Sequence, residues 1–237
     1  MLDILEQAVD RFQKTGKGVP VVSIVIDTYD AFRFVKDYLG RDLKDRVIEL
    51  GKKGGKVVVR PDSGDPVEMP IRILEILLSI FGYTVNEQGY KVLPSYIGVI
   101  QGDGINSKSI RQICVELEKR KIALSNIVFG MGGKLTHPER GRDTFSFAMK
   151  ASAQYNSNDG HWIDLFKNPI TDAGKRSLKG RVTTLKSKTD NSIIADRIEL
   201  LDINKNLEDM MIDVFLDGES LNESTFEEVR ERANADL

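Results

Sequence analysis

The stretch "RPDSGDP" (residues 60–66) gathers residue types that could bind a small anionic ligand. Arg60 carries a planar, permanently charged guanidinium, which can hold a phosphate or a flat aromatic ring. The carboxylate of Asp62 can accept hydrogen bonds from sugar hydroxyls or help to hold Mg²⁺. Ser63 adds a hydroxyl, and Gly64 allows the backbone to come close to a ligand. This turn is therefore a candidate binding site, although an Arg–Asp pair after a strand is as often a structural salt bridge.

Two glycine-rich turns further along the chain extend this chemistry. The stretch "QGDG" (101–104) sets Asp103 between two glycines. The stretch "GMGG" (130–133) leaves backbone N–H groups uncovered at Gly132 and Gly133, which suits a phosphate. The carboxylates could bind hydroxyl groups, the glycine turns could bind a monophosphate, and nearby cations could bind further phosphate. Together these groups predict a phosphorylated ribose as ligand. The cations that follow these turns are Arg142, Lys150, Lys167, Lys175, Arg176, Lys179 and Arg181.

Each of these features also has a purely structural interpretation. A glycine-rich turn after a strand is more often only a tight turn, and a basic stretch alone is more often a solvated loop. Asp27 could cap a helix that begins near Tyr29. His137 and His161 lie far apart without other ligand-type spacing, so no zinc site is predicted. The ligand interpretation is favoured because similar chemistry follows four successive predicted strands.

The elements that must position these residues alternate between strand and helix. The run 20–26 is apolar and rich in β-branched residues, which predicts a strand buried on both faces. Helix periodicity and glycine stop signals, among them Gly40, predict the intervening helices. Further buried strands are expected at 56–60, 96–100 and 126–129, helices at 2–14, 29–40, 43–53, 66–81 and 107–121, and a hairpin at 83–94.

This alternation predicts an α/β fold with a parallel sheet. The polar residues come directly after each strand, and in such folds that edge is the ligand-binding side. Asp27 and Gln101 are expected at the same edge. After residue 150 the pattern changes to successive short strands joined by turns, followed by a C-terminal helix capped by Ser224 or Thr225.

Composition excludes several classes of partner. The chain has 237 residues, of which 41% are hydrophobic and 30% charged, with a net charge of -2. An acidic chain without a basic surface is not expected to bind nucleic acid. Its longest apolar runs are too short to span a bilayer, and its start lacks a continuous apolar leader segment. Because Cys114 is the one cysteine, no internal disulfide can form, and a cytoplasmic protein is expected.

The quoted motifs, together with "DTYD", "RDTFSFAMK" and "FKNPITDAGKRSLKGR", resemble the C-terminal half of the nicotinamide phosphoribosyltransferases, which are type II phosphoribosyltransferases. The likeness weakens after about Leu185. It implies a partial (β/α) barrel over residues 1–150, a β-rich region over 151–237 and a homodimer with sites at the subunit interface. The implied reaction joins nicotinamide to 5-phosphoribosyl-1-pyrophosphate in NAD biosynthesis, giving nicotinamide mononucleotide and pyrophosphate, with Mg²⁺.

The resemblance also implies a role for individual residues. Arg60 would line the nicotinamide slot, Asp62 would hold the ribose hydroxyls, and Asp27 would lie beside the same pocket; these three are the expected catalytic residues. The residues expected to bind substrate are Ser23 and Ser63, then Gly102, Asp103, Gly132 and Gly133 on the 5-phosphate side, and Arg142, Lys150, Lys167 and Lys175 at the pyrophosphate end.

The chain departs from the family pattern in two ways. Ala148 stands where the family has a phosphate-side serine, and the loop around His137 is one residue longer. The family's chains also continue far upstream, with the histidine used in ATP coupling and the residues that read the base. We therefore expect an incomplete part of the enzyme (a fragment, a split-gene half or a truncated relative), which could regain full activity if a separate chain supplied the missing N-terminal half. The alternatives are a nicotinate phosphoribosyltransferase, a non-catalytic phosphosugar-binding module and a scaffold domain.

Overall fold

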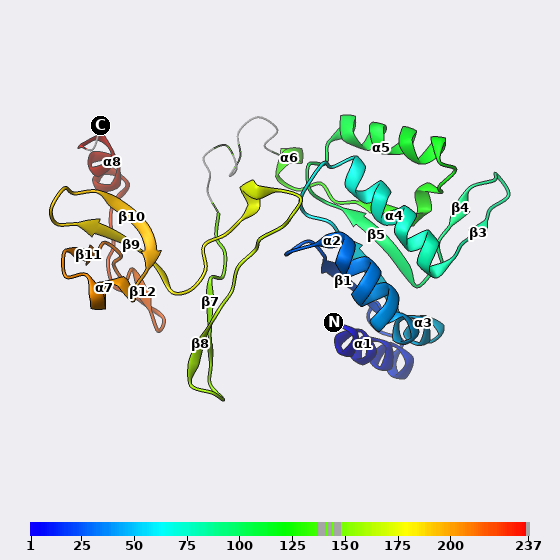
Figure 1. The fold of residues 1–237 in the computed structure, drawn as a ribbon, viewed down its shortest axis with the longest axis horizontal. Coiled ribbons are helices and arrows are strands. Elements are labelled where there is room, and N and C mark those ends of the chain that lie inside the picture. The colour runs from blue at the N-terminus through cyan, green and yellow to red at the C-terminus, as the bar shows by residue number, and fades with distance from the viewer. Residues whose placement is uncertain (137–140, 142–143, 145–147, 236–237) are drawn as a thin grey trace. The chain divides into compact units, whose positions relative to one another are not determined.

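The computed structural model describes residues 1–136, 141, 144 and 148–235. The chain divides into two units (Figure 1). The first consists of Met1–Lys150 and Phe166–Ser177, and the second of Ala151–Leu165 and Leu178–Leu237. The first unit contains the predicted binding motifs.

A four-stranded parallel sheet forms the centre of the first unit. Its strands lie in the order β1 (Val21–Val25), β2 (Lys56–Arg60), β5 (Ile97–Gln101) and β6 (Ile127–Phe129). All three neighbouring pairs are parallel. The predicted strands and their parallel arrangement are therefore confirmed, and the fold is α/β. The four strands form an open sheet. The partial (β/α) barrel therefore remains a prediction.

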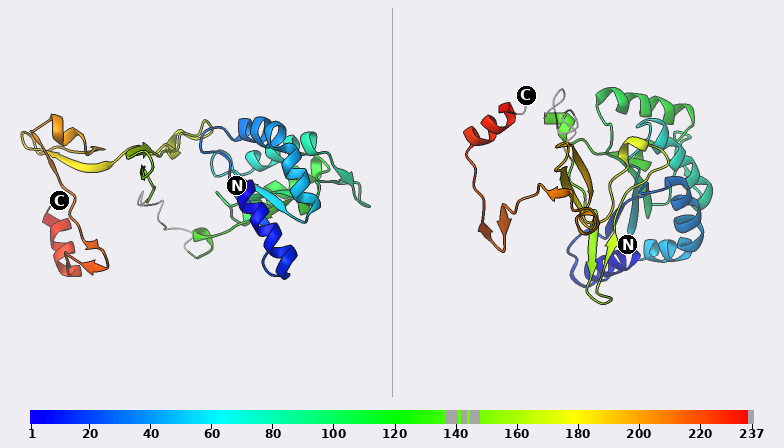
Figure 2. Two further views of the ribbon diagram at one scale, coloured as in Figure 1. Left: turned by 90° about the horizontal axis from the view of Figure 1, so that it is seen from below. Right: turned by 60° about the vertical axis from the view of Figure 1, so that its left-hand side comes forward.

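Helices connect the strands and pack on one face of the sheet. Figure 1 shows α4 and α5 running side by side, and α4 contacts β5. The predicted hairpin is present as β3 (Thr84–Val85) and β4 (Lys91–Val92), and it projects away from the sheet in both Figure 1 and Figure 2. The helices are α1 (Leu2–Thr15), α2 (Ala31–Arg33), the π-helix η1 (Phe34–Asp42), α3 (Lys44–Lys52), α4 (Glu68–Phe81), α5 (Ser107–Lys119), the 3-10 helix η2 (Leu124–Asn126) and α6 (Gly133–Thr136).

Local sequence signals explain several helix ends. Gly16 ends α1 in the left-handed conformation at φ 64°, which glycine adopts without steric cost. Asn106 and Ser109 form a reciprocal capping box at the start of α5. The α2 helix is capped by Asp30, whose side chain accepts from the N–H of Arg33 at 3.0 Å. The cap of this helix is therefore Asp30 and not Asp27.

The strand β1 differs from its prediction. Instead of being buried on both faces, it alternates, and Val21 and Val25 are 42% and 37% exposed. The inner strand β2 alternates in the same way, so one face of the sheet is covered less than the other; β1 is the more exposed of the two because it is an edge strand, with β2 as its neighbour. By contrast, Val57 and Val59 of the inner strand β2 are fully buried.

The helix predicted to end at Gly40 continues to Asp42 as η1. Gly40 serves packing instead of termination. A Cβ added there would lie 2.6 Å from Cδ1 of Ile80 in α4 and 2.8 Å from the carbonyl oxygen of Val35. The absence of a side chain lets η1 and α4 approach closely, which a sequence pattern cannot reveal.

The second unit is β-rich, as its sequence predicts. β9 (Val182–Ser187) pairs with both β10 (Ile193–Arg197) and β11 (Leu207–Asp209) in an antiparallel sheet. Thr225 and Glu228 cap the terminal helix reciprocally, which confirms Thr225 as its cap. The remaining elements are β7 (Ala153–Asn156), β8 (His161–Asp164), α7 (Leu200–Ile203), β12 (Phe215–Leu216), β13 (Glu219–Ser220) and α8 (Phe226–Ala235).

In the part of the chain that the structure describes, helices lack the combination of length and apolarity needed to cross a membrane.

Candidate functional site

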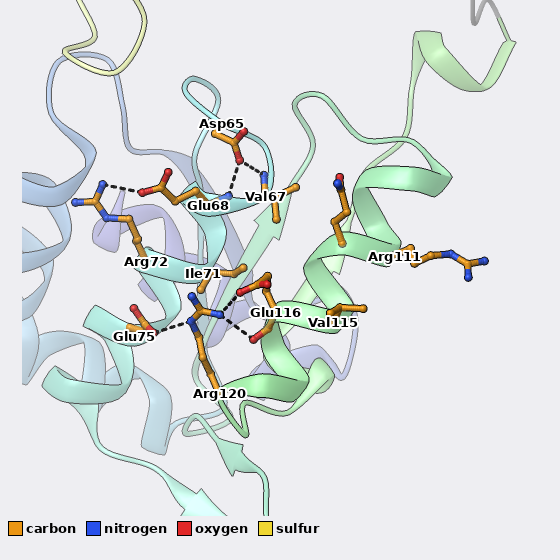
Figure 3. A pocket seen from close by; sticks show the side chains of 11 residues that line it. Asp65, Val67, Glu68, Ile71, Arg72, Glu75, Arg111, Val115, Glu116 and Arg120 are labelled. Carbon is orange, nitrogen blue, oxygen red and sulfur yellow. Dashed lines mark hydrogen bonds and ion pairs between the residues drawn. The ribbon is translucent and has the colours of Figure 1, made fainter.

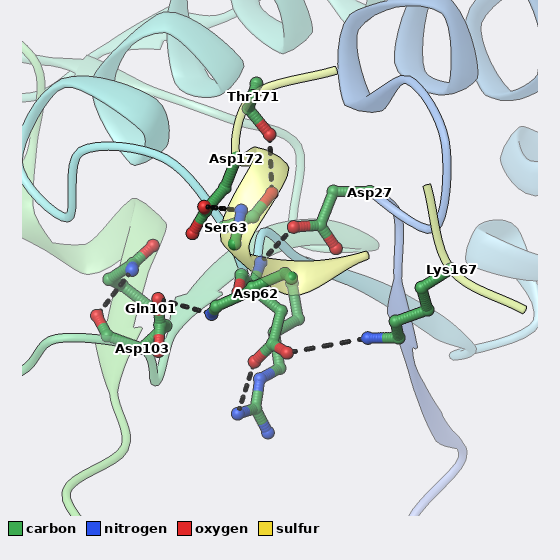
Figure 4. Close-up of polar contacts among 11 residues, drawn as sticks. Asp27, Asp62, Ser63, Gln101, Asp103, Lys167, Thr171 and Asp172 are labelled. Carbon is green, nitrogen blue, oxygen red and sulfur yellow. Dashed lines mark hydrogen bonds and ion pairs between the residues drawn. The ribbon is translucent and has the colours of Figure 1, made fainter. Parts of the chain in front are cut away.

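The carboxyl ends of the parallel strands bring the predicted polar residues together. Asp27 lies just after β1, Arg60 is the last residue of β2, and Gln101 is the last residue of β5. Because the strands are parallel, these ends share one edge of the sheet, where open α/β sheets bind ligands. Figure 4 shows the polar contacts among these groups and their neighbours.

Asp62 is the central group of this cluster. Its Oδ1 accepts a hydrogen bond from Nη2 of Arg60 at 3.0 Å, and its Oδ2 lies 3.6 Å from Nζ of Lys167. Its backbone N–H donates to Oδ2 of Asp27 at 2.8 Å (Figure 4). Asp27 therefore fixes the turn that carries Asp62, while two cations neutralise the Asp62 carboxylate.

Asp103 forms the second acidic centre. Its Oδ2 lies 2.9 Å from Nζ of Lys175, which also donates to the backbone carbonyl of Asp62. The side-chain amide of Gln101 donates to the carbonyl of Asp103 at 2.8 Å and so holds the "QGDG" turn. Lys175 thus joins the turn after β2 to the turn after β5.

The two lysines belong to a segment that returns to the sheet from far along the chain. We call residues 166–177 the lysine loop. Its ends are tied together, since the N–H of Lys167 donates to Oγ of Ser177 at 2.9 Å and the N–H of Ser177 donates to the carbonyl of Lys167 at 3.1 Å. The loop also pairs with the segment after β1, through Asn168 to Thr28 at 2.9 Å and Ile170 to Tyr29 at 2.8 Å.

Three buried polar atoms at this edge have no hydrogen-bond partner in the described part of the chain. They are Oδ1 of Asp27, Nε of Arg60 and Oε1 of Gln101. Asp27 and Gln101 are both 2% exposed. A buried polar atom left unpaired costs about 1–3 kcal/mol, so such atoms are rare in native structures. Their occurrence at three neighbouring strand ends is typical of a site that a polar ligand completes.

Gly102 provides the surface on which Arg60 lies. A Cβ added at Gly102 would be 3.2 Å from Cζ and 3.2 Å from Nη2 of Arg60. The guanidinium therefore lies against bare backbone. In the structure, the evident role of Gly102 is to make room for Arg60.

Other predicted site residues lie outside this cluster. Ser23 is in the middle of β1, paired with Val58 and exposed to solvent. Among the described residues, nothing lies within 4 Å of a Cβ added at Gly132 or Gly133. Lys150 is exposed, and Arg142 is outside the described residues. The phosphate-side roles of these residues remain predictions.

The sequence did not single out Thr171, which the structure brings to the site. Its Oγ1 is 2.5 Å from Oγ of Ser63, a residue that is 4% exposed (Figure 4). Ser63 is predicted to bind substrate, and that role stays a prediction; in the structure its hydroxyl contacts the lysine loop. The nearby signal in the sequence was the pair of lysines on either side of Thr171.

The site can supply oxygen ligands for a divalent cation only in small number. No group of three or more His, Cys, Asp or Glu side chains capable of holding a metal occurs among the described residues. The available carboxylates are Asp62 and Asp103, each beside a lysine. Mg²⁺ is commonly held by one or two carboxylates together with substrate phosphates, so this donor set fits a metal that arrives with a phosphorylated ligand.

A separate groove of about 670 Å³ lies between α4 and α5 (Figure 3). Its charged groups largely satisfy each other, since Nε of Arg120 in the α5 C-cap lies 3.1 Å from Oε1 of Glu75 and its Nη1 pairs with Glu116. Arg111 points away from the groove in Figure 3. These contacts tie the two helices together and leave the strand-end cluster as the candidate site.

The fold and this cluster define an α/β protein with a strand-end site of mixed charge. Residues 3–211 match the nicotinate phosphoribosyltransferase (NAPRTase) family. The chain belongs to this family.

Individual relatives agree with that assignment. The chain is 38% identical over 235 residues to the nicotinamide phosphoribosyltransferase of Xanthomonas campestris pv. campestris, covering 99% of this chain and 48% of the relative. It is 36% identical over 230 residues to that of Acinetobacter baylyi, covering 90% and 44%. It is 36% identical over 173 residues to that of Mycoplasma pneumoniae, covering 68% and 37%. The chain therefore spans about half the length, or less, of the curated relatives it matches.

Proposed function

We propose that this chain is part of an enzyme that transfers a phosphoribosyl group from 5-phosphoribosyl-1-pyrophosphate to nicotinamide, in NAD biosynthesis. The observation that carries the proposal is the cluster of Asp27, Arg60, Asp62 and Asp103 at three strand ends, with the lysine loop beside it. The family and the relatives' names support the same reaction class.

The lysines would act on the leaving pyrophosphate. As the bond between the ribose and the pyrophosphate breaks, negative charge develops on the departing oxygen. Lys167 and Lys175 are partly buried, with side chains 28% and 33% exposed. Cations already positioned in a partly buried site stabilise such charge without reorganising. An arriving pyrophosphate group would take over these lysines from Asp62 and Asp103.

The acidic and planar groups would hold the rest of the substrates. The released carboxylate of Asp62 would accept hydrogen bonds from ribose hydroxyls, and Oδ1 of Asp27 offers a further buried acceptor. Arg60 would lie along the flat nicotinamide ring, which its planar guanidinium favours. The 5-phosphate would meet the backbone around Asp103 and the glycines of the "GMGG" turn.

Mg²⁺ would be held by Asp62 and Asp103 together with the pyrophosphate. When bound, it would neutralise charge on that group. Lys167 and Lys175, which lie beside Asp62 and Asp103 in the structure, would then contact the pyrophosphate.

The active enzyme would need the part of the family sequence that this chain does not match. The chain spans about half the length of its relatives. We propose a cytoplasmic homodimer with sites at subunit interfaces, in which the rest of the family sequence, carried by the same polypeptide or by a separate chain, completes each site. Arg142 and Lys150 would then complete the pyrophosphate end.

The test is reconstitution. This chain is mixed with a separately made polypeptide that carries the part of the Xanthomonas relative that it does not match, and nicotinamide mononucleotide formation is assayed with Mg²⁺. Product is expected from the mixture and from neither chain alone. A well-formed complex that binds 5-phosphoribosyl-1-pyrophosphate and makes no product would indicate a non-catalytic phosphosugar-binding module.

The same assay decides the acceptor. Nicotinamide and nicotinate are supplied in competition, because the family is described by the acid while the relatives are named for the amide. Preferential consumption of nicotinate would overturn the amide assignment and leave the phosphoribosyl transfer in place.

A further inference from the structure

The hydrogen bond between Ser63 and Thr171 has no role in the chemistry proposed above. It joins two hydroxyl oxygens at 2.5 Å, and either oxygen can donate. The two residues are 108 positions apart in the chain. Ser63 lies in the buried turn after β2, and Thr171 lies in the lysine loop between Lys167 and Lys175.

The position of Thr171 within the loop suggests what the bond does. The two ends of the loop are joined to each other by the hydrogen bonds between Lys167 and Ser177, and its first half is paired with Thr28 and Tyr29. The tip, which leads into Lys175, is joined to the turn after β2 through the Thr171 hydroxyl. The Thr171 side chain also packs closely on this turn, since a Cβ added at Gly64 would lie 3.4 Å from Cβ of Thr171.

We propose that Thr171 is a positioning residue, whose hydroxyl docks the lysine loop on the Ser63 turn and thereby sets the placement of Lys175 over Asp62 and Asp103. Lys175 then meets the carbonyl of Asp62 and the carboxylate of Asp103 at the same time. This inference rests on the proposed function, because it assigns the docked loop to binding the pyrophosphate group.

Loss of the Ser63–Thr171 hydrogen bond is expected to weaken the binding of a ligand that uses Lys175. Without the hydrogen bond, the tip of the loop samples more positions, and a ligand that uses Lys175 must restrict them again on binding. Ser63 would also keep a buried hydroxyl with its partner removed. A single neutral hydrogen bond corresponds to about a threefold to tenfold change in affinity.

The experiment measures binding of inorganic pyrophosphate to the full chain by titration calorimetry at low salt. The variants are Thr171→Val, which removes the hydroxyl at nearly constant shape, and Thr171→Ser, which keeps it. Thr84→Val in the exposed strand β3 is the matched control. We expect about threefold to tenfold weaker binding for Thr171→Val, recovery in Thr171→Ser and no change in the control.

A double-variant cycle separates docking from a general loss of packing. Ser63→Ala should weaken binding much as Thr171→Val does, and the double variant should be no weaker than either single variant, because both remove the same bond. Additive losses would overturn the proposal. So would wild-type affinity in Thr171→Val, or failure of Thr171→Ser to recover; none of these three results would affect the proposed function.

Hydrogen exchange tests the dock without any ligand. The amide of Ile170 donates to the carbonyl of Tyr29 at 2.8 Å, next to Thr171 in the loop. This amide should exchange faster in Thr171→Val than in the wild type or in Thr84→Val. Absence of pyrophosphate binding by every protein, alone and when reconstituted, would count against the proposed function, whereas unchanged exchange at Ile170 would refute the docking itself.

Discussion

Replacing Gly102 with alanine should displace Arg60 and weaken ligand binding without unfolding the sheet. The added Cβ would lie 3.2 Å from Cζ, 3.2 Å from Nη2 and 3.3 Å from Nε of the Arg60 guanidinium. These separations are shorter than ordinary van der Waals contact between carbon atoms, about 3.5–4.0 Å. The backbone of Gly102 has no positive φ, so alanine is tolerated there, and the side chain that moves is Arg60.

The magnitude follows from the contacts that Arg60 makes. Its Nη2 donates to Oδ1 of Asp62 at 3.0 Å, and its buried Nε is available to a ligand. A hydrogen bond to a charged group contributes about 1.5–3 kcal/mol. Loss of one such bond in the complex corresponds to roughly tenfold to 150-fold weaker binding.

The assay combines binding with a direct probe of Arg60. Calorimetry measures the affinity of the full chain for 5-phosphoribosyl-1-pyrophosphate, and NMR follows the Nε–Hε resonance of Arg60. Gly98→Ala is the matched control, because Gly98 lies on β5, the strand that leads into Gly102, and the nearest described atom to its added Cβ is Cε of Lys56 at 3.4 Å. If Gly102→Ala binds as tightly as this control while the Arg60 resonance shifts, Arg60 does not contribute to binding. An unshifted resonance would refute the packing argument.

Three further outcomes test the fold. Gly40→Ala should lower the free energy of unfolding in urea by about 1–3 kcal/mol through overpacking, because the new Cβ would lie 2.6 Å from Cδ1 of Ile80. Asn126→Ala should cost about 1–3 kcal/mol in the same measurement, since its buried side chain both donates and accepts a hydrogen bond with the backbone beside β4. In the second unit, the Thr183 hydroxyl, 2.6 Å away, lowers the pKa of Asp209. Thr183→Val should raise that pKa in an NMR titration, and the stability lost relative to wild type should be largest at neutral pH and disappear as the pH falls through the lowered pKa of Asp209.

A specific result would contradict each of these three predictions. The control for Gly40→Ala is again Gly98→Ala, because a glycine with a positive φ, such as Gly89 at 83°, would be strained by any side chain. Equal stability of the two glycine variants would refute the close approach of η1 and α4. Wild-type stability of Asn126→Ala would mean that water replaces both bonds. For Thr183→Val, a stability difference that persists at low pH would assign the effect to packing instead of the carboxylate.

The strands and helices of the first unit could be predicted because their causes are local. β-branched runs such as Val57–Val59 define strands, and residues such as Gly16 and Asn106 end or begin helices through their own backbone geometry. The polar turns after the strands could also be recognised from the sequence. Parallel strands necessarily place such turns at one edge, so the grouping of Asp27, Arg60 and Asp103 followed from the order of elements alone.

Other features depended on contacts between distant parts of the chain. The exposure of β1 reflects its place at the edge of the sheet, and the role of Gly40 reflects an approach between helices. Ser63 and Thr171 meet across 108 positions. No local pattern encodes which residue will lie opposite such a hydroxyl.

The sequence by itself determined which chemical groups this protein brings to the ends of its strands, because strand order and residue type are written along the chain. Only the tertiary structure decided how those groups are paired. Asp62 and Asp103 are neutralised by lysines from a loop more than sixty residues downstream. Packing and Coulomb attraction in the folded protein determine which lysine lies beside which carboxylate, because residues far apart along the chain can be close in space.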